Sequence, residues 1–410
     1  MFEDNNISYE KREGGTYVAS IKVFGIGGGG NNAVNRMIQA NIKSAEFYAI
    51  NTDKQALYMS LVKEPDHRIQ IGSTLTRGLG AGADPEIGRA AAEENKEAIA
   101  ELLKNTDLLF ITAGMGGGTG TGAAPVIAAI AKELGILTIA VVTKPFAFEG
   151  NTRMKNAELG IANLRKCVDT IVIIPNDKLI TSFSRDITVV EAFKRADDVL
   201  RQGISGISDL IVYPAMINLD FADVKTVMHN RGMAHMGLGI GKGPNKTVDA
   251  IKQAVFSPLL ETTIEGSTGL IINITGGEDL KIYEVYEGVK LVRDVVDPTA
   301  SLIFGADIRE NMTGEVQVTI IATGFDAKNT LKSKPNAFFN EKVVTNADNA
   351  SPSTKDLYGT KLTSVYNTTE GDKEQPLTPK AKAVATTVPE GIIRVEDDSS
   401  IPAFLRKLKR

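Results

Sequence analysis

Short runs of apolar residues alternate with longer amphipathic stretches between residue 18 and about residue 210, and this alternation limits the possible folds most strongly. The apolar runs cover residues 21–26, 47–50, 108–112, 137–142 and 170–174. Short runs with almost no polar residue inside them are typical of parallel strands that are covered on both faces. We therefore predict a doubly wound α/β fold with a mainly parallel sheet, whose ligand site lies at the carboxyl ends of the strands.

The clearest helical pattern in this part begins at Asp84 and Pro85 and continues through Ala90 to Leu103. Aspartate accepts hydrogen bonds well at an N-cap, and proline is tolerated at the first helical position because its missing N–H would have no partner there. The pattern predicts one helix that starts at Pro85.

The chain changes character twice after residue 189. A long helical pattern leads into an α+β region, where we predict strands at 269–275, 302–304 and 316–322 and a helix at 279–296. Beyond residue 325 apolar residues are too scattered to offset the entropy of ordering the chain. We therefore divide the chain into an N-terminal extension (1–16), an α/β domain (17–189), a central helix (190–212), a smaller α+β subdomain (213–325), a disordered linker (326–398) and a C-terminal peptide (399–410).

Composition excludes several classes of function. The formal net charge is −4, whereas nucleic-acid binding needs a basic surface. No apolar run approaches the ~20 residues that span a bilayer, and residues 1–15 lack the apolar region of a signal peptide. Cys167 is the only cysteine, so neither an intramolecular disulfide nor a thiolate zinc site can form. We expect a cytoplasmic protein that binds no nucleic acid and does not insert into the membrane.

A first glycine-rich segment, from Gly25 to Asn32, follows the first predicted strand and opens a helical pattern. Glycines there let the backbone turn sharply and bring its N–H groups to an anion at a helix N-terminus. The segment also satisfies the G-x-G-x-x-G fingerprint through Gly25, Gly27 and Gly30, and Asp53 lies near the spacing of a ribose-binding acid. By itself it therefore leaves an NAD-dependent oxidoreductase open.

A second glycine-rich segment, residues 113–125, follows the strand predicted at 108–112 and also enters a helix. Successive N–H groups form an anion-binding nest, to which Thr119 and Thr121 add hydroxyls. A third segment covers residues 78–82. A dinucleotide fold needs only one such fingerprint, so we infer a triphosphate held from several sides. No G-x-x-x-x-G-K-[ST] motif occurs, which excludes a Walker-type nucleotidase.

The stretch from Gly114 to Gly122 resembles the signature loop of the tubulin/FtsZ family in its FtsZ form. The resemblance runs from about residue 21 to residue 325 and returns in the terminal peptide. Further matching segments are residues 51–53, 143–146, 148–150, 174–178 and 218–224. The resemblance implies a tubulin-like GTPase domain at 17–189, a catalytic loop within 213–325, and a role in bacterial cell division.

The resemblance also implies GTP and GDP as ligands, with Mg²⁺ on the phosphate oxygens and no metal site made by the protein alone. The positions that would contact the nucleotide from the two loops are Gly28, Gly29, Gly30, Asn31, Asn32, Gly118, Thr119 and Gly120. Glu149 and Arg153 would contact the ribose and nearby polar groups. Asp197 would accept hydrogen bonds from N1 and N2 of guanine, since a carboxylate can only accept. Phe193 either stacks on the base or packs in the core, and the sequence leaves both open.

Asn218, Asp220 and Asp223 follow the long helix. Taken alone, they are typical of an Asx-rich turn and a helix cap. The resemblance implies instead a loop that enters the nucleotide pocket of the next subunit. Asp220 and Asp223 would polarise the attacking water and Asn218 would orient it. Hydrolysis would then require a head-to-tail homopolymer, assembled as the division ring on the inner face of the membrane.

The last ten residues, 401–410, interleave four apolar residues with four cations. Apolar anchors at the end of a flexible tether are more typical of a docking peptide than of a solubilising tail. The resemblance implies that the partner is a membrane-associated division adaptor, with many tails on one filament giving avidity.

Two positions depart from the family pattern. Asp84 stands where asparagine is common and adds negative charge near the expected γ-phosphate, and Ala215 and Met216 replace a Gly-Leu pair. Three alternatives remain at this stage. An NAD-dependent enzyme leaves residues 218–223 and the second glycine-rich segment without a role. A plasmid-segregating filament leaves the terminal peptide unexplained, and a non-hydrolysing paralogue does not need the polar residues of 218–223.

Overall fold

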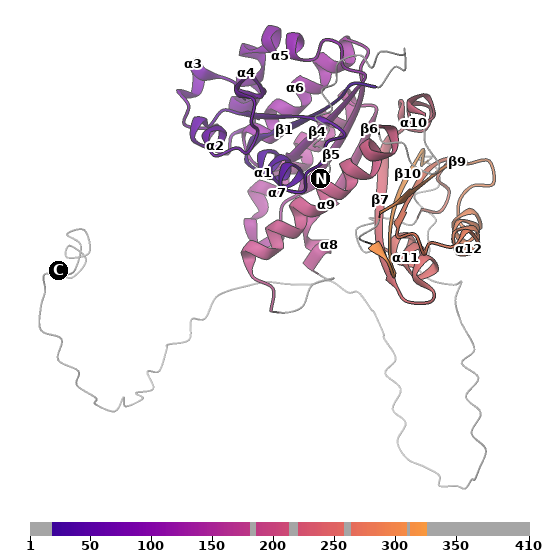
Figure 1. Cartoon of the computed structure of the whole chain (residues 1–410). Helices are drawn as coiled ribbons and strands as arrows, with labels where there is room; N and C mark the ends of the chain where they lie inside the picture. Colours follow the sequence, from indigo (N-terminus) through magenta and orange to yellow (C-terminus); the bar gives the residue numbers. More distant parts are fainter. Residues whose placement is uncertain (1–18, 181–185, 213–219, 258–263, 310–311, 326–410) are drawn as a thin grey trace, which may run out of the picture. The chain divides into compact units, whose positions relative to one another are not determined.

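A computed structural model describes residues 19–180, 186–212, 220–257, 264–309 and 312–325, all within one compact unit, Met1–Phe339 (Figure 1). The predicted N-terminal extension (1–16), linker (326–398) and C-terminal peptide (399–410) lie outside the described residues, and so does Asn218. The strands are β1 (Ile21–Ile26), β2 (Glu46–Asn51), β3 (Arg68–Gln70), β4 (Leu108–Gly114), β5 (Leu137–Lys144), β6 (Thr170–Pro175), β7 (Gly232–Lys242), β8 (Gly269–Gly276), β9 (Ser301–Ile308) and β10 (Glu315–Thr323).

Helices connect most of these strands. They are α1 (Gly27–Gln39), α2 (Lys54–Tyr58), α3 (Ser73–Thr76), α4 (Pro85–Glu94), α5 (Lys96–Leu102), α6 (Thr119–Glu133), α7 (Asn151–Cys167), α8 (Asn176–Ile180), α9 (Val189–Val212), α10 (Phe221–Met228), α11 (Lys246–Val255) and α12 (Ile282–Arg293), with 3₁₀ turns η1 (Pro65–His67) and η2 (Ala147–Glu149). Among the described helices, none has the length and apolar character needed to cross a membrane.

The strands of the described residues belong to one sheet in the order β3-β2-β1-β4-β5-β6-β7-β10-β8-β9. From β3 to β7 every neighbouring pair is parallel. The chain winds outward from β1 in one direction and from β4 in the other. In open parallel sheets ligands bind at such a switch point, beyond the carboxyl ends of the strands. The predicted doubly wound, mainly parallel fold is therefore confirmed.

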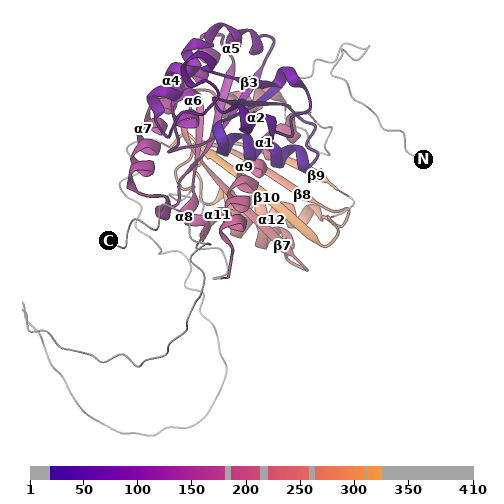
Figure 2. The same ribbon diagram turned by 90° about the vertical axis from the view of Figure 1, so that its left-hand side faces the viewer.

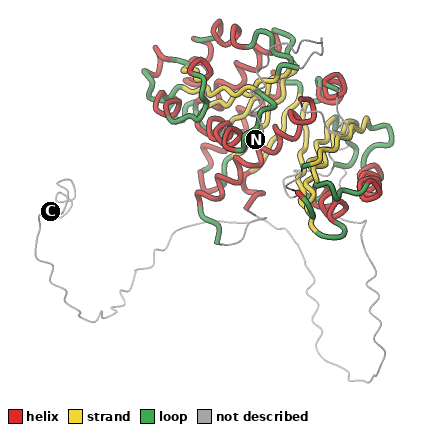
Figure 3. The backbone as a smooth tube through the Cα atoms, viewed as in Figure 1, coloured by secondary structure: helices red, strands yellow, loops and turns green. Residues whose placement is uncertain are grey.

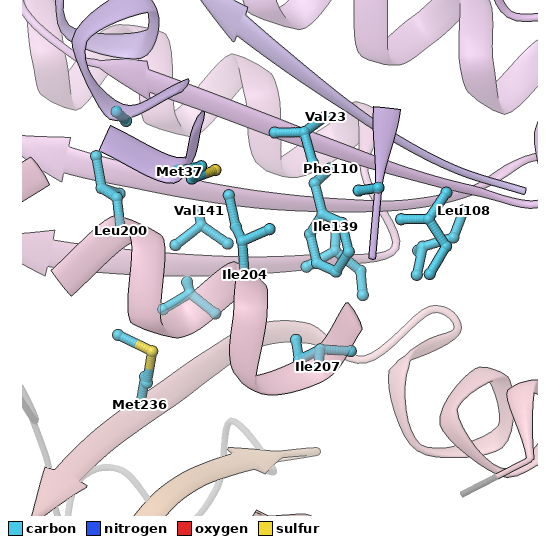
Figure 4. Close-up of a cluster of buried hydrophobic side chains, with 14 of the residues drawn as sticks. Val23, Met37, Leu108, Phe110, Ile139, Val141, Leu200, Ile204, Ile207 and Met236 are labelled. Atoms are coloured by element: carbon cyan, nitrogen blue, oxygen red, sulfur yellow. The ribbon is translucent and has the colours of Figure 1, made fainter. Parts of the chain in front are cut away.

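Successive residues of β1 point to opposite faces of the sheet, as the period of a strand requires. Val23 packs in a core with residues of α1 and α9, and Phe24 packs in a second core with residues of α4, α6 and α7. Figure 4 shows the first of these cores, in which Met37 of α1 and Ile204 of α9 lie against the strands. Because both faces are covered, the strands show apolar runs instead of alternation.

The other end of the sheet is mixed. Strand β7 pairs parallel with β6 over three residue pairs that start at Thr170 and Gly232, and antiparallel with β10 along most of its length. Strand β8 pairs antiparallel with β10 and parallel with β9. Helices α11 and α12 enclose a separate core with β8 and β10. The red helices and yellow strands of Figure 3 show this covering.

Strand β7 was not predicted, because four glycines and His235 interrupt its apolar pattern. The structure explains these glycines by the approach of α11. A methyl group on Gly237, Gly239 or Gly241 would lie within 2.0 Å of a carbonyl oxygen of α11. Contact at that distance is impossible, so the strand needs glycine on the face that meets the helix.

The helix predicted from Pro85 to Leu103 is instead two helices, and that prediction was wrong at Asn95. Asn95 ends α4 and begins α5, with φ −109° and ψ 20°. Its side-chain oxygen accepts a hydrogen bond of 2.8 Å from the backbone N–H of Gly72. This bond to a residue 23 positions away holds Asn95 outside the helical conformation, which accounts for the break.

Helix α9 is the long helix predicted at 190–212 and has 24 residues. It contacts α1 and β5 of the parallel part and β8 and β10 of the mixed part. Both views of the ribbon show it crossing the middle of the described part (Figures 1 and 2). One helix therefore packs against both the parallel part and the mixed part of the sheet.

Candidate nucleotide-binding site

The first glycine-rich segment becomes the N-terminal turn of α1, which starts at Gly27 directly after β1. Gly27 has a φ of +70°, which favours glycine. Among the described residues, no side chain caps this turn and none of its own residues is acidic. The first N–H groups of a helix have no intrahelical acceptor and carry a partial positive charge. The turn is therefore an anion site with free donors.

The second glycine-rich segment repeats this arrangement at the end of β4. Helix α6 starts at Thr119 after Gly118, and no described side chain caps it. Gly116 has a φ of +105°, and its N–H donates to the hydroxyl of Thr121 at 2.8 Å. That bond holds the loop in a tight turn around its own backbone donors.

The glycine-rich segments meet one another. A methyl group on Gly27 would lie 2.8 Å from the backbone nitrogen of Gly120. One on Gly29 would lie 3.0 Å from Gly114, and one on Gly118 would lie 2.8 Å from the Ala81 side chain of the third segment. The structure thus brings the three predicted segments together, and only glycine permits the approach. The three segments therefore lie close enough to bind one ligand together.

Asn31 and Asn51 tie the first loop to β2. Asn31 donates from its amide to the carbonyl of Gly25 at 2.7 Å and accepts from the amide of Asn51 at 2.8 Å. Its residue exposure is 3%. The side chain therefore holds the loop, and the direct nucleotide contact expected of Asn31 stays a prediction. Thr52 and Thr119 share a hydrogen bond of 2.7 Å, which joins β2 to the start of α6.

A pocket of about 590 Å³ lies between α1 and α9, beside the first loop. Its lining residues are Asn32, Asn35, Arg36, Gln39, Val190, Phe193, Lys194 and Asp197. The structure thus places Asn32, Phe193 and Asp197 together. Phe193 is 40% exposed and meets the ring of Phe146 edge-on at 5.2 Å, so it packs on one side and borders the pocket on the other.

Asp197 is half-buried in this pocket. Burial raises the pKa of its carboxyl to about 7, the charge of Arg36 lowers it, and Asp198 raises it further. Burial disfavours the charged form because water no longer solvates it. Hydrogen-bond donors from a ligand would stabilise the ionised form of Asp197, and two adjacent N–H groups would suit one carboxylate.

Glu149 and Arg153 form an ion pair of 2.9 Å in which Glu149 is the buried partner. The other carboxylate oxygen of Glu149 accepts from the backbone N–H of Phe146 at 2.9 Å. Arg153 lies against the second loop, where a methyl group on Gly116 would meet its backbone oxygen at 2.7 Å. The pair therefore places a cation beside the phosphate-binding loop.

Two aspartates near the site are engaged as helix caps. Asp53 accepts from the backbone N–H groups of Gln55 and Ala56, and Asp84 accepts from that of Glu86. The N-cap role predicted for Asp84 is confirmed. In the dinucleotide-binding alternative, Asp53 would bind the ribose. In the structure its carboxylate is instead the N-cap of α2.

Asp220 and Asp223 lie elsewhere in the described chain. Both are exposed on the first turn of α10, where Asp220 is the N-cap and accepts from the N–H of Ala222 at 3.3 Å. Helix α10 packs against β8 and β9, which end the sheet, whereas the phosphate loops follow β1 and β4. The structure therefore does not unite these carboxylates with the phosphate loops of the same chain.

The prediction of site residues omitted Arg36. Arg36 lines the pocket and acts on Asp197 through its charge. Asn176, at the carboxyl end of β6, is 4% exposed, and its side-chain oxygen has no hydrogen-bond partner in the described part of the chain.

The strand order, the two uncapped glycine-rich helix starts and the pocket beside a central helix define a tubulin-like nucleotide-binding protein. Residues 20–184 match the family model "Tubulin/FtsZ family, GTPase domain", and residues 232–326 match "FtsZ family, C-terminal domain". A solved FtsZ dimer from M. jannaschii, described as empty, is 45% identical with a TM-score of 0.72, covering 76% of this chain and 89% of that one.

Two archaeal structures from Haloferax volcanii share the fold at lower identity. CetZ1, a GDP-bound monomer, is 21% identical with a TM-score of 0.64, covering 74% of this chain and 94% of that one. CetZ2, a GTPγS-bound protofilament, is 19% identical with a TM-score of 0.63, covering 74% and 92%. On the matches to FtsZ, this chain belongs to the FtsZ family of GTP-binding, polymerising cytoskeletal proteins, whose GTPase domain it carries.

Replacing Asp197 with asparagine should stabilise the nucleotide-free protein at alkaline pH. The pKa of this carboxyl is raised, so the folded state binds the extra proton between about pH 4 and 7, and the charged group opposes folding above that range. We expect Asp197→Asn to raise the melting temperature at pH 8 by about 2–4 °C and to have little effect at pH 4.5. Glu158→Gln, on the exposed side of α7, is the control and should change neither value. An equal gain at both pH values would contradict the titration of Asp197.

Proposed function

We propose that this protein assembles head-to-tail into the protofilaments of a bacterial division ring and hydrolyses GTP at the contact between subunits. Asn218, Asp220 and Asp223 of one subunit complete the nucleotide site of the next. The proposal rests on family membership and on the separation of the two halves of the site. GTP hydrolysis itself is supported by the GTPase domain of the family.

The separation of Asp220 from the phosphate loops carries the in-trans proposal. Helix α9 starts after β6 and α8, on the side where the parallel strands end, and its 24 residues extend about 36 Å at 1.5 Å per residue. Asp220 lies eight positions beyond its last residue. One chain therefore holds the loops and the carboxylates far apart, whereas stacking two chains brings the carboxylates of one toward the loops of the other.

The nucleotide would lie across the N-termini of α1 and α6. Backbone donors of Gly28, Gly29 and Gly30 face the phosphates from one side, and Gly118, Thr119 and Gly120 from the other. Arg153 and Glu149 lie beside the second loop, at the ribose. The base enters the pocket between α1 and α9, where Asn32 and Phe193 border it. Asp197 accepts from guanine N1 and N2, which relieves its buried charge.

Hydrolysis in this arrangement relies on positioning and electrostatics. Asp220 and Asp223 polarise the attacking water, and Asn218 orients it. Among the described residues no three His, Cys, Asp or Glu side chains lie together as a metal site, so Mg²⁺ would take its ligands mainly from phosphate and water. A heterologous contact that does not close gives an open filament, and loss of the γ-phosphate weakens the same contact.

The proposed division of the chain follows these roles. Residues 17–189 bind GTP, 190–212 form the central helix, and 213–325 carry the catalytic loop. Residues 1–16 extend the N-terminus, and 326–398 tether the adaptor-binding peptide at 399–410. Many peptides on one filament would bind a membrane-associated adaptor with avidity and hold the ring at the division site on the cytoplasmic side.

Phosphate release per chain tests the shared active site. With Mg²⁺ present, the rate per chain should be near zero at low protein concentration and rise above a threshold. Asp220→Ala should bind GTP and assemble normally while hydrolysing at least ~100-fold more slowly, since positioned proton acceptors contribute 10²–10⁴. Asp249→Ala, another exposed aspartate in the first turn of a helix, should match the wild type. A rate per chain that is independent of concentration would contradict the proposal.

Nucleotide selectivity tests the role of Asp197. An asparagine there keeps one acceptor and gains a donor, which matches xanthine, whose C2 carries an oxygen where guanine carries an amino group. Asp197→Asn should therefore lose GTP affinity by about 10- to 100-fold and gain affinity for XTP, measured by titration at low salt. Equal losses for both nucleotides would remove Asp197 from the base site.

Deleting residues 401–410 tests whether adaptor binding and GTP hydrolysis belong to separate parts of the chain. The truncated protein should keep GTP hydrolysis and its concentration threshold but lose recruitment of the adaptor to filaments, measured by co-sedimentation. Loss of hydrolysis together with recruitment would show that the tail is needed by the enzyme itself.

A further inference from the structure

Helix α10 carries the two proposed catalytic carboxylates at one end and is anchored at the other. Asp220 and Asp223 lie exposed on its first turn. The buried side chains of the helix follow these carboxylates and are Val224, Val227 and Met228. They pack in the first core, with residues of α1 and α9. The carboxylates therefore lie at the less buried end of the helix.

The carbonyl groups at the C-terminus of α10 all have hydrogen-bond partners. The last four carbonyls of a helix have no partner within the helix itself. In α10 the first of these, the carbonyl of Lys225, accepts from the backbone N–H of His229 at 2.8 Å. The other three accept from side chains: Thr226 from Arg231 at 3.1 Å, Val227 from the hydroxyl of Thr323 at 2.9 Å, and Met228 from the hydroxyl of Thr170. Side chains from β6, from β10 and from the segment after the helix therefore fix this end of α10.

Asp169, which directly precedes β6 and is buried, holds the residues that follow α10. One of its carboxylate oxygens pairs with the ring of His229 at 2.7 Å and accepts from the backbone N–H of Asn230 at 3.2 Å. The other oxygen accepts from the backbone N–H of Thr138, the second residue of β5, at 2.9 Å. Asp169 and Thr170 therefore join the end of α10 to the amino ends of β5 and β6 (Figure 1). The phosphate loops follow the carboxyl ends of the parallel strands, at the opposite edge of the sheet.

We propose that Thr170 is a positioning residue for the carboxylates of α10. Its hydroxyl fixes the C-terminal end of the helix whose first turn presents Asp220 and Asp223 to the nucleotide of the next subunit. Asp169 and Thr323 act on the same end of the helix in the same way. This role rests on the proposed function, since it requires that hydrolysis uses the carboxylates of a neighbouring chain.

The length of α10 makes the carboxylates sensitive to the anchored end. Its 8 residues extend about 12 Å at 1.5 Å per residue. A tilt of about 10° around the anchored end would therefore move the first turn by about 2 Å. A displacement of about 1 Å at a reacting centre can lower the rate about 100-fold. Losing the hydrogen bond at Met228 can therefore slow hydrolysis at Asp220 without altering the phosphate loops.

Replacing Thr170 with valine removes the hydroxyl and keeps the size of the side chain. We expect filaments of Thr170→Val to hydrolyse GTP about tenfold more slowly, because the first turn of α10 shifts. The affinity for GTP, measured below the assembly threshold, should stay within about twofold of the wild type, since the phosphate loops are unchanged. Thr170→Ser keeps the hydroxyl and should restore most of the rate. Thr138→Val is the matched control, because Thr138 is equally buried and its hydroxyl donates to the carbonyl of Ile136; this variant should match the wild type.

Mixed filaments show which side of the subunit contact the substitution affects. Each contact combines the nucleotide site of one chain with the carboxylates of its neighbour. Thr170→Val and Asp220→Ala chains in equal amounts should hydrolyse GTP at less than about one-tenth of the wild-type rate, because neither supplies well-placed carboxylates. If Thr170→Val instead damaged its own nucleotide site, about a quarter of the contacts would combine two intact halves. A rate of about a quarter of the wild-type rate would therefore overturn the proposal.

The single variants separate the positioning role from the shared active site. A wild-type rate for Thr170→Val would overturn the positioning role and leave the shared site intact, whereas a wild-type rate for Asp220→Ala would contradict the shared site itself. If Thr170→Val also loses GTP binding, its fold is disturbed, and a substitution at the surface decides. Arg231→Met removes the donor to Thr226 and should lower the rate about threefold, whereas Arg165→Met, on the exposed side of α7, should not. Equal rates for these two arginine variants would overturn the proposal.

Discussion

The approach of two helix N-termini, those of α1 and α6, is the constraint on which the rest of the structure depends. Each helix presents unbonded N–H groups and a partial positive charge, and the two starts are separated only by glycine backbone. Side chains at Gly27 or Gly29 would force the helices apart. Two like partial charges at close range favour an anion between the helices, so we expect a negatively charged ligand at the central crossover of the sheet.

The parallel half of the fold was predictable because its strands are buried on both faces, which leaves apolar runs that stand out from the helices. The half of the sheet with mixed strand directions was harder to predict. Strand β7 has glycine wherever α11 approaches, and that requirement exists only once the helix is in place. The break at Asn95 likewise depends on Gly72, a partner 23 residues away. Contacts between distant segments, not local preferences, decided both cases.

The candidate site divides in the same way. Glycine-rich turns after strands predict phosphate loops from sequence, because the backbone N–H groups would be the binding groups there. The roles of side chains depend on their surroundings and could not be predicted in the same way. The side chain of Asn31, which was predicted to contact the nucleotide, is buried and hydrogen-bonds to the first loop. Asp53 and Asp84 are helix caps. The environment of Asp197 arises from burial between α1 and α9. No local pattern encodes that burial, so only family resemblance pointed to the residue.

The length of α9 has a consequence for the polymer. In the proposed filament, one end of this helix lies at the nucleotide and the other leads to the loop that meets the neighbour's nucleotide. The length of the helix then sets a distance along the filament axis. The spacing between successive nucleotides then follows from its 24 residues and the loop beyond them. Adding one helical turn would lengthen that spacing by about 5.4 Å. On this proposal the axial repeat depends on the length of α9, and mutations that bend the helix would change filament geometry without altering the contact surfaces.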